Sequence, residues 1–323
     1  MMEFVIASGK GGTGKSTVSS TLLLELHRRG YSVVAVDADA EAPNLHLIFG
    51  LDNWEFTEEM EEGRVALIIQ DKCTGCGKCA ELCSFDAIRR AGDKYVVNQM
   101  ICEGCMTCML ACPSKAIIMK SVIRGYVRGG VTKYGFPLVG GQLRPGRPNS
   151  GRLVTAVKEK ARKMAGESSV LIVDSAAGIG CQVIASIAGA NGVVLVAEPT
   201  PAGFSDLKRI HRVAKHFMLP SALIVNKHDL NPEMTKQILR YAEEENMFIL
   251  GLIPYDDTVP RSMAMRKPHI EAHPDSPATQ ALREVAERFV KEVLEDWRAW
   301  SRRYKPRKPE PYTPLIITSK IDK

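Results

Sequence analysis

The sequence has no apolar run that approaches the roughly 18 residues needed to cross a membrane. It also has little net charge: the formal charge is +6 over 323 residues, spread along the chain. A balance this mild does not by itself point to nucleic acid as a partner. The first residues lead directly into an apolar segment without the features of a signal peptide, so we expect a cytoplasmic protein.

Other composition values are ordinary. Apolar residues make up 45% of the chain and charged residues 25%, as in typical globular proteins. A chain of this length can bury a large core and has room for one large domain and a small one.

The segment Gly9–Thr17 reads GKGGTGKST and matches the phosphate-loop pattern G-x-x-x-x-G-K-[ST]. The apolar run before it, residues 3–8, predicts a buried strand, and the leucines after it predict a helix that ends before Gly30. Glycines let backbone N–H groups point at phosphate oxygens, and the start of the helix adds partial positive charge. We predict that Lys15 reaches the β- and γ-phosphates and that the Ser16 hydroxyl holds Mg²⁺. The nucleotide-binding set is Gly11, Gly12, Thr13, Gly14, Lys15, Ser16 and Thr17.

Lys10, directly after the first glycine, is a second lysine in this loop. With it, the loop resembles the deviant phosphate loop of the MinD/ParA/Mrp and nitrogenase iron-protein group of ATPases. The resemblance implies binding of ATP or ADP with Mg²⁺, hydrolysis of ATP, and a homodimer with nucleotide between the subunits. It also implies that Lys10 reaches the phosphates bound by the partner subunit.

Two acidic segments resemble further motifs of these ATPases. The run DADAEAPNL resembles their first switch segment, which implies that Asp37 positions the attacking water and that Asp39 lies near the metal. Asp174 follows a third buried strand and resembles the second acidic motif, so it is expected to contact the Mg²⁺ shell. Gly178 is implied to sense the γ-phosphate through its N–H group. The alternative for these carboxylates is a structural role at the ends of strands.

Later segments resemble the part of these ATPases that recognises the base. Asn226 resembles the adenine-reading asparagine, whose amide can pair with a donor and an acceptor. A turn-forming asparagine is the alternative. Pro254 and Asp256 follow the last predicted strand, where the family places its second adenine wall.

Eight of the nine cysteines lie within forty residues, in two runs with the same spacing. Each cysteine of the second run follows its counterpart in the first by 29 residues, which indicates an internal duplication. The pattern resembles a bacterial two-cluster ferredoxin, in which the fourth cysteine of each run binds the other cluster. The resemblance assigns one [4Fe–4S] cluster to Cys73, Cys76, Cys79 and Cys112, and the other to Cys102, Cys105, Cys108 and Cys83. Zinc is the alternative, but these runs do not fit the usual pair of zinc knuckles.

The remaining segments carry weaker signals. Cys181 stands where the nitrogenase iron protein has a cluster-binding switch cysteine, but no second cysteine accompanies it near Gly146, so we predict a small, partly buried thiol. Residues 125–151 are rich in glycine without clear periodicity, and we interpret them as a return loop, after which Ser150 caps a helix. Residues 277–304 predict one long amphipathic helix, whose mixed charge favours packing onto the ATPase over a membrane.

Alternating strands and helices predict an α/β fold with a doubly wound, mostly parallel sheet of the phosphate-loop ATPase type. An α+β ferredoxin-like domain is expected to interrupt it. We expect the ATPase domain at 1–60 and 124–276, the ferredoxin insert at 61–123, the amphipathic helix at 277–305 and an extended tail at 306–323.

The sequence predicts an ATPase in which Mg·ATP-driven switching of the dimer is coupled to electron transfer through two [4Fe–4S] clusters to an unidentified redox partner. The first alternative is an iron–sulfur carrier or assembly ATPase, although no cysteine follows Cys181 to form the late pair that such carriers use. The second is a MinD-like positioning ATPase with structural clusters. Neither nucleic acid nor a membrane is an expected partner.

Overall fold

The structure is a computed structural model and describes residues 1–144 and 151–306. The predicted helix cap at Ser150 and all of the predicted tail after Pro306 lie outside the described residues. No described helix is long and apolar enough to cross a membrane.

A nine-stranded sheet, in the order β11-β10-β9-β1-β8-β2-β7-β6-β3, forms the centre of the molecule. Seven strands run parallel and the last two run antiparallel to their neighbours. The parallel strands are nearly continuous apolar runs, because helices cover both faces. The prediction of a mostly parallel α/β sheet is therefore confirmed. The strands are β1 (Met2–Ser8), β2 (Val33–Ala38), β3 (Phe56–Ile68), β6 (Ile117–Val131), β7 (Pro137–Leu143), β8 (Val170–Ala177), β9 (Gly192–Ala197), β10 (Ser221–Asn226) and β11 (Phe248–Ile253).

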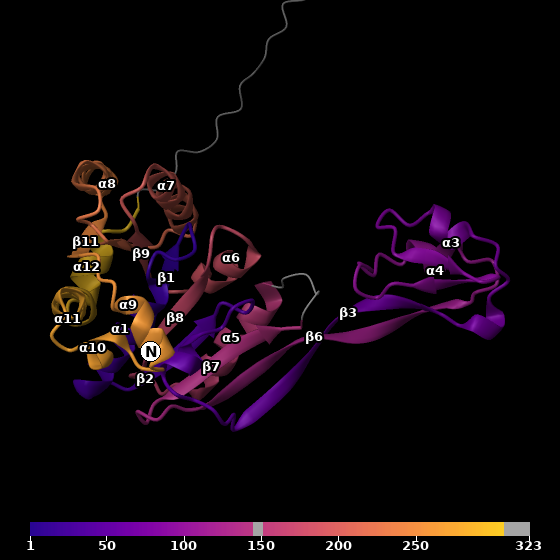
Figure 1. Cartoon of the computed structure of the whole chain (residues 1–323), viewed down its shortest axis with the longest axis horizontal. Helices are drawn as coiled ribbons and strands as arrows, with labels where there is room; N and C mark the ends of the chain where they lie inside the picture. Colours follow the sequence, from indigo (N-terminus) through magenta and orange to yellow (C-terminus); the bar gives the residue numbers. More distant parts are fainter. Residues whose placement is uncertain (145–150, 307–323) are drawn as a thin grey trace, which may run out of the picture.

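Two hydrophobic clusters, one on each face of the sheet, make up the core of the main body. Figure 1 shows the helices arranged on the two faces. One face packs against α1 (Lys15–Arg28), α2 (Leu45–Ile48), α9 (Val259–Ala264), α10 (His269–Ala272) and α11 (Pro277–Arg288). The other packs against α5 (Gly151–Met164), α6 (Cys181–Ile187), α7 (Pro201–His216) and α8 (Pro232–Glu244).

The long antiparallel pair β3 and β6 extends beyond the sheet and forms an arm. The arm ends in a small unit, residues 69–116, which we call the head and which stands apart from the main body in Figure 1. A small core of its own joins the head to the end of the arm. The head contains a 3-10 turn (Gln70–Lys72), α3 (Lys78–Glu81), β4 (Ile88–Ala91), β5 (Lys94–Val97) and α4 (Thr107–Ala111).

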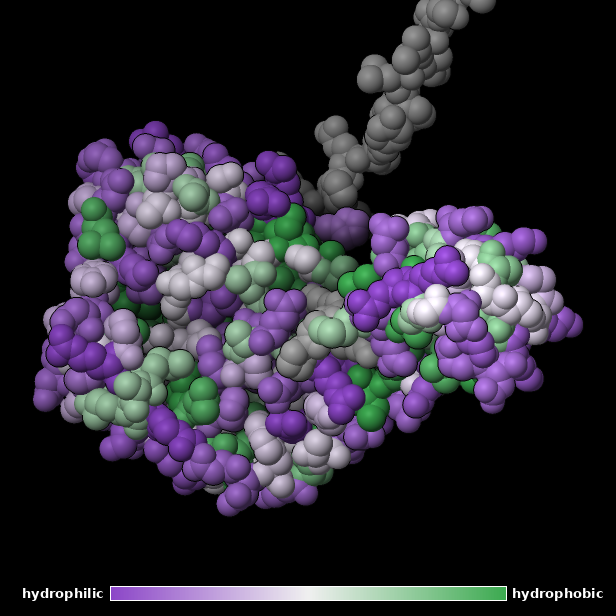
Figure 2. All heavy atoms as spheres, turned by 45° about the vertical axis from the view of Figure 1, so that its right-hand side comes forward, coloured by the Kyte–Doolittle hydropathy of each residue, from purple (hydrophilic) through white to green (hydrophobic). Residues whose placement is uncertain are grey.

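The surface mixes hydrophilic and apolar residues over both the main body and the head (Figure 2). Apolar side chains of the head that remain exposed include Leu82, Phe85 and Leu110. The even mixture agrees with a net charge that is small and spread along the chain.

The glycine-rich segment 125–151 was wrongly predicted to be a loop. Its described part completes β6 and forms β7, which pairs with β2 on one side and β6 on the other. Gly135, with a φ of 94°, lies in the turn between β6 and β7, whereas Gly125 and Gly129 serve close packing. A Cβ on Gly125 would come within 2.7 Å of the Gln142 carbonyl oxygen, and one on Gly129 would overlap the Phe56 ring.

The periodicity predicted one continuous α-helix in the C-terminal segment, and this prediction is wrong. It forms α11, a π-helical stretch (Phe289–Leu294) and α12 (Trp297–Arg303). The rings of Phe289, Trp297 and Trp300 lie 5.0, 5.5 and 6.5 Å from the ring of Phe4 in β1. The wider turn of the π-helical stretch changes which of the following side chains face the sheet. This change accompanies the packing of the three aromatic rings around Phe4.

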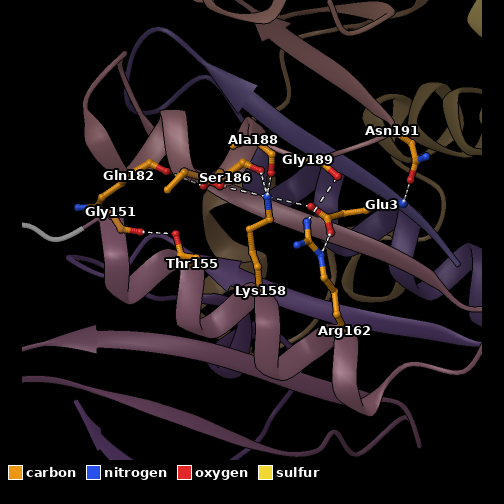
Figure 3. Close-up of polar contacts among 11 residues, drawn as sticks. Glu3, Gly151, Thr155, Lys158, Arg162, Gln182, Ser186, Ala188, Gly189 and Asn191 are labelled. Atoms are coloured by element: carbon orange, nitrogen blue, oxygen red, sulfur yellow. Dashed lines mark hydrogen bonds and ion pairs between the residues drawn. The ribbon is translucent and has the colours of Figure 1, made fainter. Parts of the chain in front are cut away.

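Lys158 is buried in the main body, where it joins α5 to α6 and to β1 (Figure 3). Its ammonium group lies 2.9 Å from the Glu3 carboxylate and donates to the carbonyl oxygens of Ala185 and Ser186 at the end of α6. Arg162, one turn further along α5, makes a second ion pair with Glu3 at 2.7 Å. The cluster fixes α5 and α6 against the start of β1.

We expect Lys158→Met to destabilise the protein by about 3–5 kcal/mol, because Glu3 stays buried after losing one of its cationic partners. Urea unfolding of the nucleotide-free protein measures the change. Lys163→Met, an exposed position on the same helix, is the control and is expected to stay within about 0.5 kcal/mol of wild type. Equal stabilities of the two variants would contradict a structural role for the buried cluster.

Candidate functional site

The glycine loop lies between β1 and α1, at the carboxyl edge of the parallel strands, as predicted. Gly12 and Gly14 have positive φ angles of 75° and 97°, which favour glycine over other residues. Gly14 is also needed for space, since a Cβ there would overlap the Asn226 side chain. Sequence and backbone thus agree on a loop whose N–H groups can face a phosphate.

Lys15 and Ser16 begin α1 and point into a polar cluster. The Ser16 hydroxyl donates to Asp174 at 2.6 Å, and the Ser19 hydroxyl donates to the other carboxylate oxygen at 2.9 Å. Lys15 donates to the Ser8 hydroxyl at 3.0 Å. Burial lowers the pKa of Lys15, and the charge of Asp174 opposes that shift. The structure therefore brings together the predicted phosphate and magnesium residues.

Asp37 lies one residue before the end of β2, beside Asp174, and is almost fully buried. Its carboxylate accepts the backbone N–H groups of Asn44 and Leu45 at 2.8 and 2.9 Å, so it holds the following segment in place. We call residues 39–47 the switch segment. Burial and then the charge of Asp174 raise the pKa of Asp37 well above its ordinary value.

Asn44 is a site residue that the sequence reasoning missed. Its side-chain amide donates to the Ser16 hydroxyl at 3.1 Å, while its backbone donates to Asp37. An asparagine after proline in the run EAPNL was the available signal. Asp39 lies nearby and accepts from the backbone of Ala42 at 3.2 Å. Gly178 has a φ of 97° and donates its N–H to the Ser8 carbonyl, so this N–H group already has a partner.

Lys10 forms an ion pair with Glu198 of its own chain, at 2.5 Å. Glu198 follows β9, and it also pairs with Lys227 at 3.4 Å. Although burial alone would raise the pKa of Glu198, its contacts with the two lysines hold it below the ordinary value. No sequence pattern predicts this contact, and it engages the lysine that was expected to reach across a dimer.

The predicted base-recognition residues lie around the ends of β10 and β11. The Asn226 amide donates to the Thr13 carbonyl at 2.8 Å, so in this structure it contacts the loop. Pro254 directly follows β11. The Asp256 carboxylate accepts the Thr258 N–H at 2.9 Å, a contact that favours a structural role over the predicted contact with the base.

Two pockets in the head are each lined by four cysteines. The first is lined by Cys73, Cys76, Cys79 and Cys112, and the second by Cys83, Cys102, Cys105 and Cys108. These are the two ligand sets expected for the clusters, with the fourth cysteine exchanged between the runs. Among the described residues, no three Cys, His, Asp or Glu side chains stand close enough to hold a single metal ion.

Several of these sulfur atoms accept hydrogen bonds from the backbone. The N–H groups of Ala87 and Ala116 lie 3.3 Å from the sulfurs of Cys83 and Cys112. Such bonds stabilise thiolates that bind iron–sulfur clusters. Cys181 lies outside both pockets, at the start of α6, and is exposed rather than partly buried as predicted.

The fold and the loop together define a phosphate-loop, nucleotide-binding protein. The family model for the CobQ/CobB/MinD/ParA nucleotide-binding domain matches residues 4–269. An uncharacterized protein of Methanocaldococcus jannaschii is 32% identical over 264 residues, which cover 82% of this chain and 88% of that protein. The chain belongs to the CobQ/CobB/MinD/ParA family.

Two further proteins are similar to this chain. An iron–sulfur cluster carrier protein of Pyrococcus furiosus is 24% identical over 310 residues, covering 91% of this chain and 87% of that one. The septum site-determining protein MinD of Pyrococcus horikoshii, solved with Mg-ADP, superposes with a TM-score of 0.56 at 19% identity. That comparison covers 90% of this chain and 97% of the other, and it supports the fold.

We expect the buried Asp174 carboxyl to make a contribution to the stability of the nucleotide-free, metal-free protein that falls as the pH rises from about 4 to above 6. Burial raises the pKa of Asp174 to about 6, whereas the unfolded value is near 3.9. Asp174 therefore ionises first in the unfolded chain, and the contribution of this one group falls by about 2–3 kcal/mol across the interval.

The Asp174→Asn variant removes that ionisation, so its stability should exceed that of wild type by a margin that grows over the same pH interval. Denaturant titrations at several pH values measure the difference. Asp275→Asn changes an exposed carboxyl and should follow the wild-type curve. A constant offset between Asp174→Asn and wild type would show that Asp174 is already ionised at pH 4.

Proposed function

We propose that this protein is a Mg·ATP-hydrolysing dimer that carries two [4Fe–4S] clusters and uses the nucleotide to control electron transfer through them. One observation carries the proposal: a nucleotide-binding loop and two pockets, each with four cysteines, occur in one chain. Family membership supports nucleotide binding; hydrolysis, the metal ion, the clusters and the electron transfer are the proposal's own steps.

The division of the cysteines into two sets of four supports clusters over zinc. In a two-cluster ferredoxin the fourth cysteine of each run binds the other cluster. The cysteines line two pockets in that exchanged arrangement. When bound, the clusters would supply one-electron carriers, and the backbone N–H groups of Ala87 and Ala116 would stabilise the charge on their ligands.

At the nucleotide site, Lys15 would neutralise charge on the phosphates and Ser16 would bind Mg²⁺, with Asp174 completing the metal's surroundings. Asp37 would accept a hydrogen bond from the attacking water once the switch segment moves to release an oxygen. Lys10 would exchange Glu198 for the phosphates of a second subunit, so that nucleotide binding favours the dimer.

A row of paired residues leads from the nucleotide site to the arm. Asp174 of β8 pairs with Asp37 of β2, which pairs with Gly140 of β7, and Gly140 pairs with Arg128 of β6. Because β6 continues into the arm, a shift of β2 or the switch segment has a short route to the head. Coupling between sites is expected through elements that have two arrangements, and the proposal requires the switch segment to be such an element.

The relative from Pyrococcus furiosus favours a second candidate, an iron–sulfur carrier. A carrier should release its clusters to an apo-acceptor, whereas an electron carrier should retain them through many redox cycles. Transfer of radiolabelled iron to an apo-ferredoxin, followed with and without Mg·ATP, distinguishes the two functions.

We expect anaerobically purified protein to contain about eight iron and eight sulfide atoms per chain, as two [4Fe–4S] clusters require. Cys79→Ser and Cys108→Ser should each lower the count by about half, because each removes a ligand from a different pocket. Cys181→Ser, which changes the cysteine outside the pockets, should leave it unchanged. Bound zinc, or equal iron in all four proteins, would refute the assignment.

We also expect Mg·ATP to shift the midpoint potential of at least one cluster by about 60 mV, which is a tenfold change in a one-electron equilibrium. A coupling energy of about 1–3 kcal/mol is typical between linked sites. The Lys15→Gln variant should keep both clusters and lose the shift, as measured by redox titration monitored by EPR. An unchanged midpoint potential in the wild-type protein would show that Mg·ATP does not control the clusters.

A further inference from the structure

A third pocket, of about 290 Å³, lies between the switch segment and the base of the arm. Its walls include Asp37, His46, Trp54, Arg128 and Gln142. The glycine loop does not contribute to it, so the pocket is distinct from the phosphate site, although the two share Asp37. Its volume and its mixture of aromatic and polar walls are typical of sites for small molecules.

Arg128 gives this pocket its charge. The guanidinium lies 6.0 Å from the centre of the Trp54 ring and 5.0 Å from that of Tyr126, within the range of cation–π contacts. Its Nε atom is buried and has no hydrogen-bond partner within the described part of the chain. Removing such a donor from water costs free energy unless a partner replaces the water. The site is therefore incomplete without an acceptor.

The rings of His46 and Trp54 make up an aromatic part of the pocket wall. The His46 and Trp54 rings lie 5.4 Å apart and are tilted by 44°. Burial, followed by the charges of Arg266 and Arg128, lowers the pKa of His46, so this ring is neutral near pH 7. Gly140 forms part of the floor next to Asp37 and adds no side chain to the pocket.

We propose that this pocket binds a small organic monocarboxylate whose flat, apolar body lies against Trp54 and His46. The planar fork of one guanidinium matches a carboxylate in two parallel hydrogen bonds. Arg128 is the one Arg or Lys among the residues that line the pocket, so it balances one negative charge and a phosphate dianion fits the site less well. Binding here requires neither iron nor nucleotide.

Position gives the ligand a consequence for the nucleotide site. Asp37 forms a wall of the pocket and also holds the backbone of Asn44 and Leu45. A bound carboxylate would restrict movement of the switch segment by filling the space beside it. The pocket is thus an effector site that acts on the same carboxyl group as the nucleotide.

The test uses benzoate as the probe and the full, nucleotide-free chain. We expect saturable binding by isothermal titration calorimetry, with a matching change in tryptophan fluorescence that the Trp54→Phe variant lacks. Arg128→Gln should weaken binding by about ten- to hundredfold, the usual worth of a charge-assisted hydrogen bond. Lys120→Gln removes an exposed cation elsewhere on β6 and should bind like wild type.

Benzamide has the same ring without the charge and should not bind measurably; inorganic phosphate should not displace benzoate. These two comparisons need only wild-type protein, so they decide the matter even if Arg128→Gln does not fold. Equal binding of benzamide, displacement by phosphate, unchanged affinity in Arg128→Gln, or no saturable binding up to about 10 mM benzoate would each overturn the assignment.

Discussion

The double pairing of β7 is the constraint on which the arrangement of this molecule depends. This strand runs parallel to β2, which carries Asp37, and antiparallel to β6, which leaves the sheet to form the arm. Without β7, no strand pairing would connect the arm and head to the rest of the sheet. With β7 in place, the backbone hydrogen bonds of one sheet continue from the glycine loop to the arm.

The part of the site that could be predicted from sequence is the part whose chemistry fixes both residue type and spacing. Gly14 needs a positive φ and a Cβ-free surface, and Lys15 and Ser16 must follow it at the start of a helix. The cysteine runs are equally constrained, because the spacing of each run decides which sulfurs can face one space. These local rules leave few alternatives.

Long-range contacts could not be predicted in this way. The pairing of Lys10 with Glu198 joins residues far apart in sequence, and no pattern marks it. The strand β7 was missed because Gly140 and Gly141 resemble loop residues, although they leave room for Asp37 and Val157 in a crowded sheet. The π-helical stretch was missed because its apolar residues fit a regular helix until they must pack around Phe4.

The resting nucleotide site is already satisfied by bonds within the chain. Ser16 donates to Asp174, Lys15 to Ser8 and Asn226 to the loop carbonyl of Thr13. A nucleotide must therefore exchange these bonds for its own, so its net gain per contact is much smaller than the strength of each bond alone.

Charge makes this exchange favourable. Burial raises the pKa of Asp174 and lowers that of Lys15, which shows that both charged forms are poorly stabilised without a ligand. A cation beside Asp174 and a phosphate beside Lys15 would each supply the missing opposite charge. The Ser16–Asn44–Asp37 contacts then place the switch segment next to the point where charge changes most. We therefore expect the switch segment to be the first part of the chain that responds when a nucleotide binds.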